Sequence, residues 1–337
     1  MRQRWLTEPL AQLTIRSIMK YVFGPVPSRR LGQSLGIDTL PLKTCNWNCI
    51  YCQLGRTRPL TNERKVYIPC EDILAEAKSA LASHAPGKID WITFVGSGEP
   101  TLHSEIGYLI DEIKALTNIP VAVITNGSLL HLPEVRADLS AADVVMPSLD
   151  AGNAKLYRKL NRPHGQTTFE RLVDGLIAFS DEYQGKLWVE VMLIKGWNDS
   201  ESALREIADI LKRVEADEVH LLLPTRPPAE SLVRPADEEG LLRARAILGQ
   251  VAEVVHPTSG TFDLSGASSL EEAIIGIITR HPMREDDLNN ALKHWSSTEL
   301  ESVLDNLLRS GQAQIITRYG VRFWSGKGAY YQEENQQ

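Results

Sequence analysis

The sequence has few cysteines and no long apolar run, and both absences restrict what the protein is. Four cysteines occur in 337 residues, and three of them lie between residues 45 and 52, which excludes a disulfide framework. No segment approaches the roughly 18 consecutive apolar residues of a membrane-spanning helix. The basic start, Met1 to Trp5, leads into Glu8 and Gln12 and not into the apolar core of a signal peptide. We therefore expect a protein of the reducing cytoplasm with no membrane partner.

The chain has fewer basic than acidic residues, with 36 lysines and arginines against 43 aspartates and glutamates. The formal net charge is −7, which argues against broad electrostatic attraction to nucleic acid. The hydrophobic share of 43% and the charged share of 23% are ordinary for a globular protein. The length suits one large α/β domain with an appendage.

The segment from Lys43 to Cys52 carries the strongest signal in the sequence. Cys45, Cys49 and Cys52 have a C-x3-C-x2-C spacing and directly follow an apolar run at 35–42 that we expect to be a strand. Thiolates are soft ligands that select iron–sulfur clusters, zinc or copper. Zinc sites normally close with four ligands, and Cys70 stands alone in the sequence. An iron–sulfur cluster with one open iron is thus favoured over a zinc site or three unrelated thiols.

The rest of the chain alternates between helical and strand patterns. We expect helices at 71–84, 105–116, 151–160, 167–179, 201–214 and 237–248, and strands at 89–95, 120–124, 143–146, 187–194 and 219–223. The strands are nearly continuous Val, Ile and Leu runs, as in a parallel sheet covered on both faces. Polar or glycine-rich motifs follow the strands at Cys45, Gly98-Glu99-Pro100, Thr125-Asn126-Gly127, Ser148, Asp150, Lys195 and Thr225-Arg226. In a barrel of parallel strands this end is the catalytic face.

The cysteine spacing, with Tyr51 just before the last cysteine, resembles the signature of the radical S-adenosylmethionine (SAM) superfamily. The resemblance implies that Cys45, Cys49 and Cys52 hold a [4Fe-4S] cluster whose open iron binds SAM. An external one-electron donor of the flavodoxin or ferredoxin kind then reduces the cluster. SAM is cleaved to a 5′-deoxyadenosyl radical, which abstracts hydrogen from a substrate.

The segment Gly96-Ser97-Gly98-Glu99-Pro100 resembles the superfamily's "GGE" element. The resemblance implies that Ser97, Gly98 and Glu99 hold the SAM ammonium group through backbone carbonyls and the carboxylate. It also implies SAM contacts from Ser148, Asp150 and Glu190, with Tyr51 and Asn126 completing the expected cofactor-binding set. An alternative for Asp150 is the N-cap of the helix at 151–160.

Four further segments are similar to the wyosine-synthase branch, which builds a tricyclic base on a tRNA guanosine. They lie at 98–102, 148–151, 157–163 and 193–199. Those enzymes carry a second cluster, for which Cys70 alone is insufficient, and the flanks of their cysteine loop differ. The reaction is therefore not settled by the resemblance.

These patterns predict a partial (β/α)6 TIM-like barrel at 30–257, preceded by a helix and a loop at 1–29. The helix is expected at 1–22, and prolines and glycines predict a loop without strand structure from Phe23 to Gly32. A linker at 258–267 leads to a C-terminal domain at 268–337. Its expected elements are helices at 270–280, 285–294 and 297–310 and a hairpin at 312–324, which together resemble a winged helix.

Three substrate classes remain open: a tRNA base, a peptide and a small metabolite. RNA is favoured by the wyosine-like segments, by Arg29-Arg30 as an anion contact, and by the basic residues Arg318, Arg322 and Lys327 of the wing. A peptide is favoured by the acidic third helix of the C-terminal domain. Lys43 and Lys195 are candidates for a Schiff base with a carbonyl substrate, although a surface ion pair is favoured for each. A non-catalytic iron–sulfur regulator is the alternative from another class.

Overall fold

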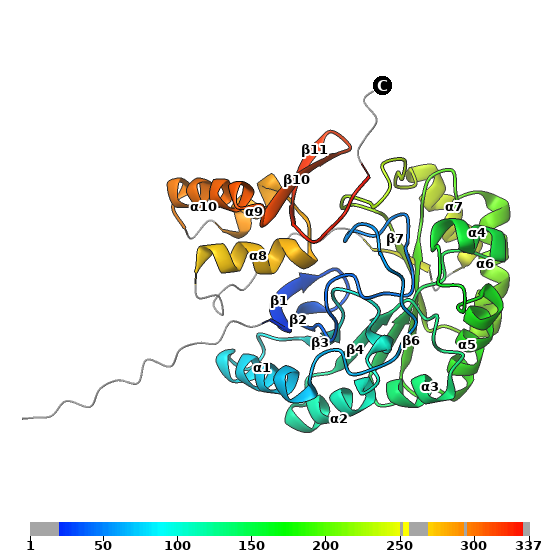
Figure 1. The fold of residues 1–337 in the computed structure, drawn as a ribbon. Coiled ribbons are helices and arrows are strands. Elements are labelled where there is room, and N and C mark those ends of the chain that lie inside the picture. Colours follow the sequence, from blue (N-terminus) through cyan, green and yellow to red (C-terminus); the bar gives the residue numbers. More distant parts are fainter. Residues whose placement is uncertain (1–19, 250–251, 256–268, 293–294, 333–337) are drawn as a thin grey trace, which may run out of the picture.

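The computed structural model describes residues 20–249, 252–255, 269–292 and 295–332. Eight strands form one sheet in the sequential order β1 to β8 (Figure 1). Strands β2 to β8 run parallel, and β1 pairs antiparallel with β2. The strands are β1 Val22–Ser28, β2 Gly32–Ile37, β3 Trp91–Phe94, β4 Val121–Thr125, β5 Val144–Pro147, β6 Lys186–Met192, β7 Glu218–Leu222 and β8 Ala252–Val254. Within the described residues β1 and β8 do not pair with each other, so the sheet is open and consistent with a partial barrel.

Helices connect the parallel strands and follow one another around the outside of the sheet (Figure 1). They are α1 Cys70–Ser83, α2 Ile106–Leu116, α3 Pro133–Leu139, α4 Ala154–Leu160, α5 Phe169–Glu182, α6 Glu201–Val214 and α7 Glu238–Leu248, with a short 3-10 helix at Pro100–Leu102. No helix of the described part is long and apolar enough to cross a membrane.

The two faces of the sheet have different apolar layers, because successive side chains of a strand point to opposite faces. Ile92, Val121, Val145 and Val189 belong to the large core that includes the helices. The alternate residues form a separate layer: Ala122, Val144, Met146 and Trp188 pack with Leu31 from the β1–β2 turn. That turn therefore inserts into the inner side of the curved sheet.

The predicted loop from Phe23 to Gly32 is wrong, because β1 occupies most of it. The β1–β2 register shifts between Phe23 and Val26, at Gly24-Pro25. A proline that donates no hydrogen bond is tolerated in an edge strand, where one side of the backbone is unpaired. Prolines therefore mark an irregular edge strand here, and only Arg29 to Leu31 connect β1 to β2.

The sheet also has more parallel strands than the six predicted. The sequence did not predict β8, which is only three residues long. It also did not predict the helix α3, which begins with Pro133. Neither segment has a clear periodic pattern.

Most of the helix predicted at 1–22 and the whole linker predicted at 258–267 lie outside the described residues. The end of that predicted helix is wrong, since Val22 already belongs to β1.

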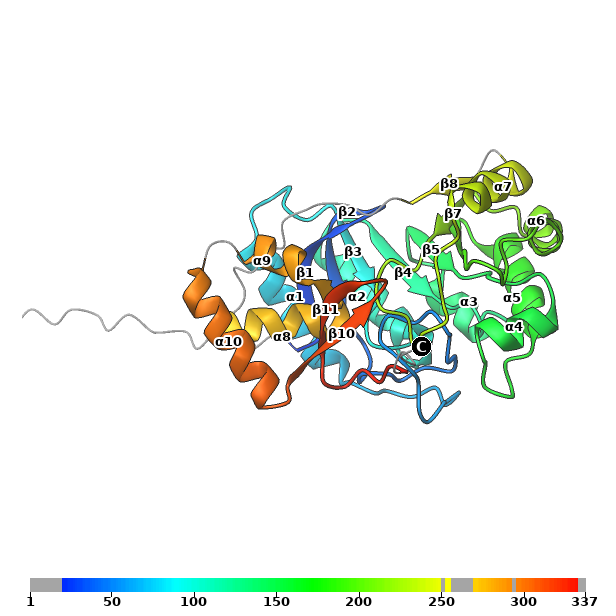
Figure 2. The ribbon, with the colours of Figure 1, turned by 90° about the horizontal axis from the view of Figure 1, so that it is seen from above.

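The C-terminal region has its own small core. The predicted helices and hairpin are present as α8 Leu270–Arg280, α9 Glu285–Ala291, α10 Ser297–Arg309, β10 Ala313–Arg318 and β11 Val321–Gly326. A short β9 at Met283–Arg284 adds a third strand in the order β10-β11-β9. Apolar residues such as Ile274, Leu288, Leu307 and Trp324 pack together between these elements. In both views this region lies on the β1 side of the large sheet (Figure 1, Figure 2).

Candidate active site

The three motif cysteines lie in the segment between β2 and α1, at the carboxyl end of the parallel strands. All three side chains are half-buried and free of disulfides. Burial, with a smaller contribution from Glu99, raises the pKa of Cys45 to about 12. Burial and then the neighbouring thiols Cys52 and Cys45 raise the pKa of Cys49 well above its ordinary value. Bound iron would offset these effects, because a metal cation favours the thiolate form and would displace the protons of the thiols.

The thiols are not arranged around one ion. No three His, Cys, Asp or Glu side chains of the described residues are placed to hold a single metal ion. Tetrahedral zinc requires its ligands to surround one centre, whereas the thiolates of a cluster each bind a different iron. A set of three thiols is of the kind that holds an iron–sulfur cluster.

Each of the three sulfur atoms is also within hydrogen-bonding distance of an N–H donor. The donors are the Trp47 backbone N–H (3.4 Å) and Asn126 Nδ2 (3.9 Å) for Cys45, Asn161 Nδ2 (3.8 Å) for Cys49, and Lys43 Nζ (3.2 Å) for Cys52. Hydrogen bonds to cluster sulfurs raise and tune the reduction potential. These donors would stabilise the negative charge of the three sulfur atoms when they are present as thiolates.

The loop after β3 packs directly against the cysteine loop. The Lys43 N–H donates to the Ser97 carbonyl at 2.6 Å, and the Glu99 N–H donates to the Thr44 carbonyl at 3.0 Å. A Cβ atom on Gly98 would lie 1.8 Å from the Thr44 carbonyl oxygen. Only glycine permits this approach, so Gly98 fixes the distance between the predicted SAM-binding loop and the cysteine loop.

Glu99 is 2% exposed, and the protein itself saturates its carboxylate. One oxygen accepts from the Thr101 N–H (3.1 Å), Thr101 Oγ1 (2.6 Å) and Thr125 Oγ1 (2.5 Å), and the other accepts from the Asn126 N–H (2.6 Å). A carboxylate has about four acceptor positions. Glu99 therefore joins the loop after β3 to the end of β4, and the backbone carbonyls remain the better candidates for the SAM ammonium group.

Asp150 is buried and ties the cysteine loop to two strands. Its carboxylate accepts from Tyr51 Oη, from Asn161 Nδ2 at 2.7 Å and from the Met192 N–H at 2.9 Å. The alternative that Asp150 caps the next helix is wrong, because Asn153 caps α4 through the Leu156 N–H. Tyr51 is thus held by Asp150, which positions the chain between Cys49 and Cys52.

Glu190 lies near Ser148, since β5 and β6 continue into a bridge between these two residues. Its carboxylate pairs with Arg30, whose guanidinium also lies 3.5 Å from His220 Nδ1. The predicted contact of Glu190 with SAM stays a prediction, and the pairing with Arg30 was not anticipated from the sequence.

The two lysines considered for a Schiff base lie in different surroundings. Lys43 Nζ donates to the Gly55 carbonyl at 2.8 Å as well as to the Cys52 sulfur. Lys195 pairs with Asp237 at 2.9 Å, and both side chains are about half exposed. The ion pair favoured for Lys195 is thus present, whereas Lys43 belongs to the cysteine loop.

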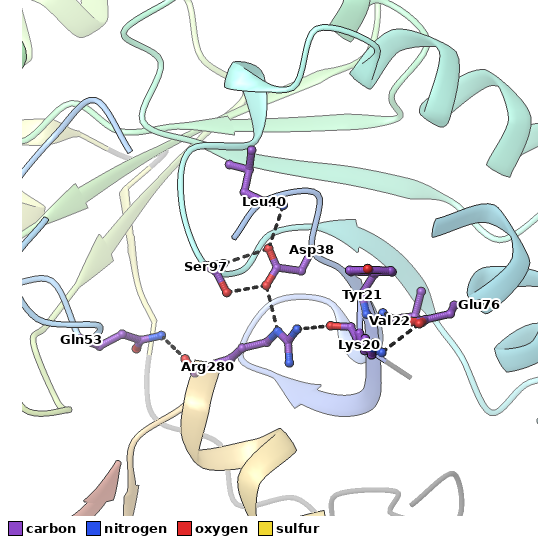
Figure 3. Close-up of polar contacts among 9 residues, drawn as sticks. All are labelled: Lys20, Tyr21, Val22, Asp38, Leu40, Gln53, Glu76, Ser97 and Arg280. Atoms are coloured by element: carbon purple, nitrogen blue, oxygen red, sulfur yellow. Dashed lines mark hydrogen bonds and ion pairs between the residues drawn. The ribbon is translucent and has the colours of Figure 1, made fainter. Parts of the chain in front are cut away.

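The end of α8 connects the C-terminal region to this site (Figure 3). Arg280 Nε donates to Asp38 Oδ2 at 2.9 Å, and Asp38 accepts from the Ser97 N–H at 3.1 Å and Ser97 Oγ at 2.6 Å. Gln53, next to Cys52, donates to the Arg280 carbonyl at 3.1 Å. Arg280 therefore contacts both the cysteine loop and, through Asp38, the predicted SAM loop. Tyr331 Oη adds a hydrogen bond to the Gln53 carbonyl at 2.5 Å.

Comparison with known proteins shows the family to which this chain belongs. The radical SAM superfamily pattern matches residues 39–221, which is more than half of the chain. A UPF0026 protein of Methanocaldococcus jannaschii is 35% identical over 279 residues, covering 81% of this chain and 86% of that protein. The chain belongs to the radical SAM superfamily and to the UPF0026 family. It is an enzyme of the radical SAM class, and the cofactors of the class are a [4Fe-4S] cluster and SAM.

Other known proteins are similar over part of their own length. A protein named GTPase Obg from Brachyspira hyodysenteriae is 41% identical over 90% of this chain, but the chain spans only 44% of that protein. A GTP 3′,8-cyclase of Lactiplantibacillus plantarum is 28% identical over 47% of this chain and 45% of that enzyme. Among solved structures, a radical SAM methyltransferase of Sphaerobacter thermophilus has a TM-score of 0.49 and 21% identity, covering 66% of this chain and 65% of its own.

Proposed function

We propose that this radical SAM enzyme cleaves SAM reductively and abstracts hydrogen from a bound substrate. The observation that supports the proposal is the set of three half-buried cysteines, each with an N–H donor to its sulfur, beside the Gly96–Glu99 loop. When bound, the cluster and SAM supply the electron and the carbon radical, chemistry that no side chain provides.

The residues of the chain hold and orient these groups. We assign Cys45, Cys49 and Cys52 to the irons and the backbone of Ser97 and Gly98 to the SAM ammonium group. Asn126 Nδ2 bonds Asn46 Oδ1 at 2.7 Å, so it links the end of β4 to the cysteine loop. Ser148, Asp150 and Glu190 remain our proposed contacts for the rest of SAM, with Asp150 acting in part through Tyr51.

An external electron donor is part of the proposal. Cys70 is the only cysteine outside the motif, and it is buried with its thiol donating to Glu105 at 3.0 Å. One leftover thiol does not hold a second cluster, so we propose a flavodoxin- or ferredoxin-like partner in the cytoplasm.

The test is anaerobic reconstitution of the full chain with iron and sulfide. We expect about four irons per chain and, with dithionite and SAM, 5′-deoxyadenosine. Cys49→Ala should lose both, while Cys70→Ala should keep both. Equal turnover in the Cys49→Ala variant would refute the assignment.

For the substrate, we propose an RNA base as one candidate, with the C-terminal region as a winged helix that binds it. The wyosine-like segments support this candidate, but the wing supports it less than expected. Arg318 is only 4% exposed, and Arg322 lies 3.3 Å from Glu285, so of the three predicted wing cations only Lys327 is an exposed residue without a carboxylate partner among the described residues. Bulk tRNA binding with a steep salt dependence would support RNA.

A small phosphorylated compound is the second candidate. Two arginines near the cysteine loop have no carboxylate partner among the described residues, and a relative is named for a reaction of GTP. A peptide substrate remains the third possibility, and for it the acidic face of α10 is the supporting feature. Product analysis with each substrate class decides between them.

A further inference from the structure

The arginines near the cysteine loop fall into two groups. Arg30 pairs with Glu190, and Arg280 pairs with Asp38. Arg29 and Arg226 lie in the same part of the molecule, yet neither has an ion-pair partner among the described carboxylates. Arg29 Nη2 donates to Thr225 Oγ1 at 2.6 Å, and Arg226 Nη1 donates to Gln53 Oε1 at 2.8 Å. The protein therefore holds these two guanidinium groups with neutral partners.

Holding the two charges in this way is unfavourable for the protein alone. Burial and then the charge of Arg30 lower the pKa of Arg29, and burial and then the charge of Arg29 lower the pKa of Arg226 to about 10. The more distant carboxylates Glu190 and Asp287 offset these effects only in part. Both residues are half-buried. Confined charges of one sign are normally paired or bind an ion.

His281 adds a hydrogen-bond donor at the same place. Its Nδ1 lies 3.4 Å from Arg226 Nη1, and an arginine only donates, so Nδ1 accepts. The proton of the neutral ring is then on Nε2, which is buried and has no partner among the described atoms. A buried N–H without an acceptor is rare in proteins, and an oxyanion provides one.

The position relates this cluster to the proposed chemistry. Gln53, which bonds Arg226, directly follows Cys52, and Arg226 lies in the loop that begins at the carboxyl end of β7. Arg29 lies in the turn that inserts Leu31 among the inner residues of the sheet. Arg226 therefore lies beside the cysteine loop, and Arg29 contacts Thr225, the residue before Arg226.

We propose that Arg29 and Arg226, with His281, bind a phosphate group of the substrate. Two guanidinium charges match the double negative charge of a phosphate monoester, and guanidinium geometry suits its oxygens. The inference deepens the proposed function and rests on it, because the phosphate is taken to belong to the molecule that donates hydrogen.

The test is equilibrium binding of inorganic phosphate and AMP to the full chain. We expect both to bind and to compete, with binding at least tenfold weaker in Arg29→Gln and Arg226→Gln. Arg226→Lys should lie between the wild type and Arg226→Gln, because it keeps the charge without the fork. The control is Arg205→Gln, which removes an exposed arginine of α6 paired with Glu201 and should change nothing.

Two further arms identify the source of the phosphate. AMP that binds more tightly than inorganic phosphate indicates a nucleotide, and bulk tRNA that displaces AMP indicates RNA. Equal binding of AMP and inorganic phosphate indicates another phosphorylated metabolite. The proposal is overturned if the wild type binds none of these probes, if succinate binds more tightly than phosphate, or if the glutamine variants bind as the wild type does.

Failure of this site is distinguishable from failure of the proposed function. Wild-type cleavage of SAM is measured without any phosphate probe. If SAM is cleaved but AMP binding does not depend on Arg29 and Arg226, only the phosphate site is wrong. If AMP binding depends on them but no 5′-deoxyadenosine forms, the phosphate site stands and the proposed reaction is wrong.

Discussion

The cysteine side and the arginine side of the site treat buried charge in opposite ways. On the cysteine side, the buried carboxylates of Glu99 and Asp150 accept four and three hydrogen bonds from the chain, respectively. On the arginine side, Arg29 and Arg226 have only neutral partners among the described residues. The buried carboxylates of the cysteine side are therefore paired by the chain itself, as expected for a rigid cofactor-binding site. The second side is incomplete, as suits a place where a ligand supplies the missing charge.

Arg280 makes the comparison sharper because it borders both sides. Its side chain is 13% exposed and pairs with Asp38, which is 4% exposed. The same guanidinium donates to the Lys20 carbonyl at 2.6 Å (Figure 3). Arg280 is therefore expected to stabilise the fold, whereas Arg226, close by, is expected to serve binding.

The largest loss of stability should follow from Glu99→Gln. The new amide turns one acceptor into a donor that faces either the Asn126 N–H or the two threonines. Leaving buried donors unsatisfied costs about 1–3 kcal/mol each, so we expect a total loss of about 4 kcal/mol. Urea unfolding of the cluster-free chain measures it, with the exposed Glu134→Gln of α3 as the control. A loss below about 1 kcal/mol would show that the saturated carboxylate is unimportant.

The second-largest expected effect is a difference in stability between variants of the ion-paired Arg280 and of Arg226, which has no ion-pair partner among the described residues. Arg280→Gln leaves Asp38 without its cation and should destabilise the chain by about 3 kcal/mol, since breaking a buried pair is costly. Arg226→Gln removes an unpaired charge and should cost nothing or stabilise slightly. Urea midpoints in phosphate-free buffer give both values. The reverse order would contradict the distinction between a structural and a ligand-binding arginine.

A smaller effect concerns pH. Burial, then Arg226 and Arg280, lower the pKa of His281 well below its ordinary value of 6.5. The unfolded chain then binds a proton that the folded chain does not, so stability is lost as pH falls below about 6.5. Between pH 7.5 and 5.5 the wild type should lose about 1 kcal/mol more than His281→Asn. Equal losses in urea titrations at the two pH values would count against a neutral His281.

The smallest effect should come from Lys43. Its ammonium donates to the Cys52 sulfur at 3.2 Å, and a positive charge there favours the reduced cluster. Lys43→Met should therefore lower the cluster potential by roughly tens of millivolts, the size of an effect near 1 kcal/mol on a one-electron couple. Lys43→Arg, which keeps the charge, should stay near the wild type. Spectroelectrochemical titration measures the three potentials, and an unchanged Lys43→Met would remove Lys43 from this role.

Local patterns in the sequence were sufficient to predict the strands and helices that carry the site. Continuous apolar runs predicted β3 to β7, and the resemblance of Gly96 to Pro100 to the superfamily's GGE element indicated the loop that meets the cysteine loop at Gly98. The prolines of β1 misled because their meaning depends on the strand being at an edge, which is a property of the sheet and not of the segment. β8 is too short to produce a pattern at all.

Long-range partners escaped prediction for a different reason. Arg280 and Asp38 are 242 residues apart in the chain, and neither stands in a motif. Asn161 bonds Asp150 and approaches the Cys49 sulfur, yet in the sequence it is only a polar residue after a helix. The lack of an ion-pair partner for Arg226 among the described residues could not be predicted either, because it depends on which elements surround the residue.

The central claim is that one iron of a cluster on Cys45, Cys49 and Cys52 binds SAM. The most direct measurement is electron paramagnetic resonance of the reduced, reconstituted chain with and without SAM. We predict a signal of a single [4Fe-4S]⁺ cluster whose g-values change when SAM is added, and no such signal in Cys49→Ala. A cluster signal that SAM leaves unchanged, or one that survives in Cys49→Ala, would contradict the claim.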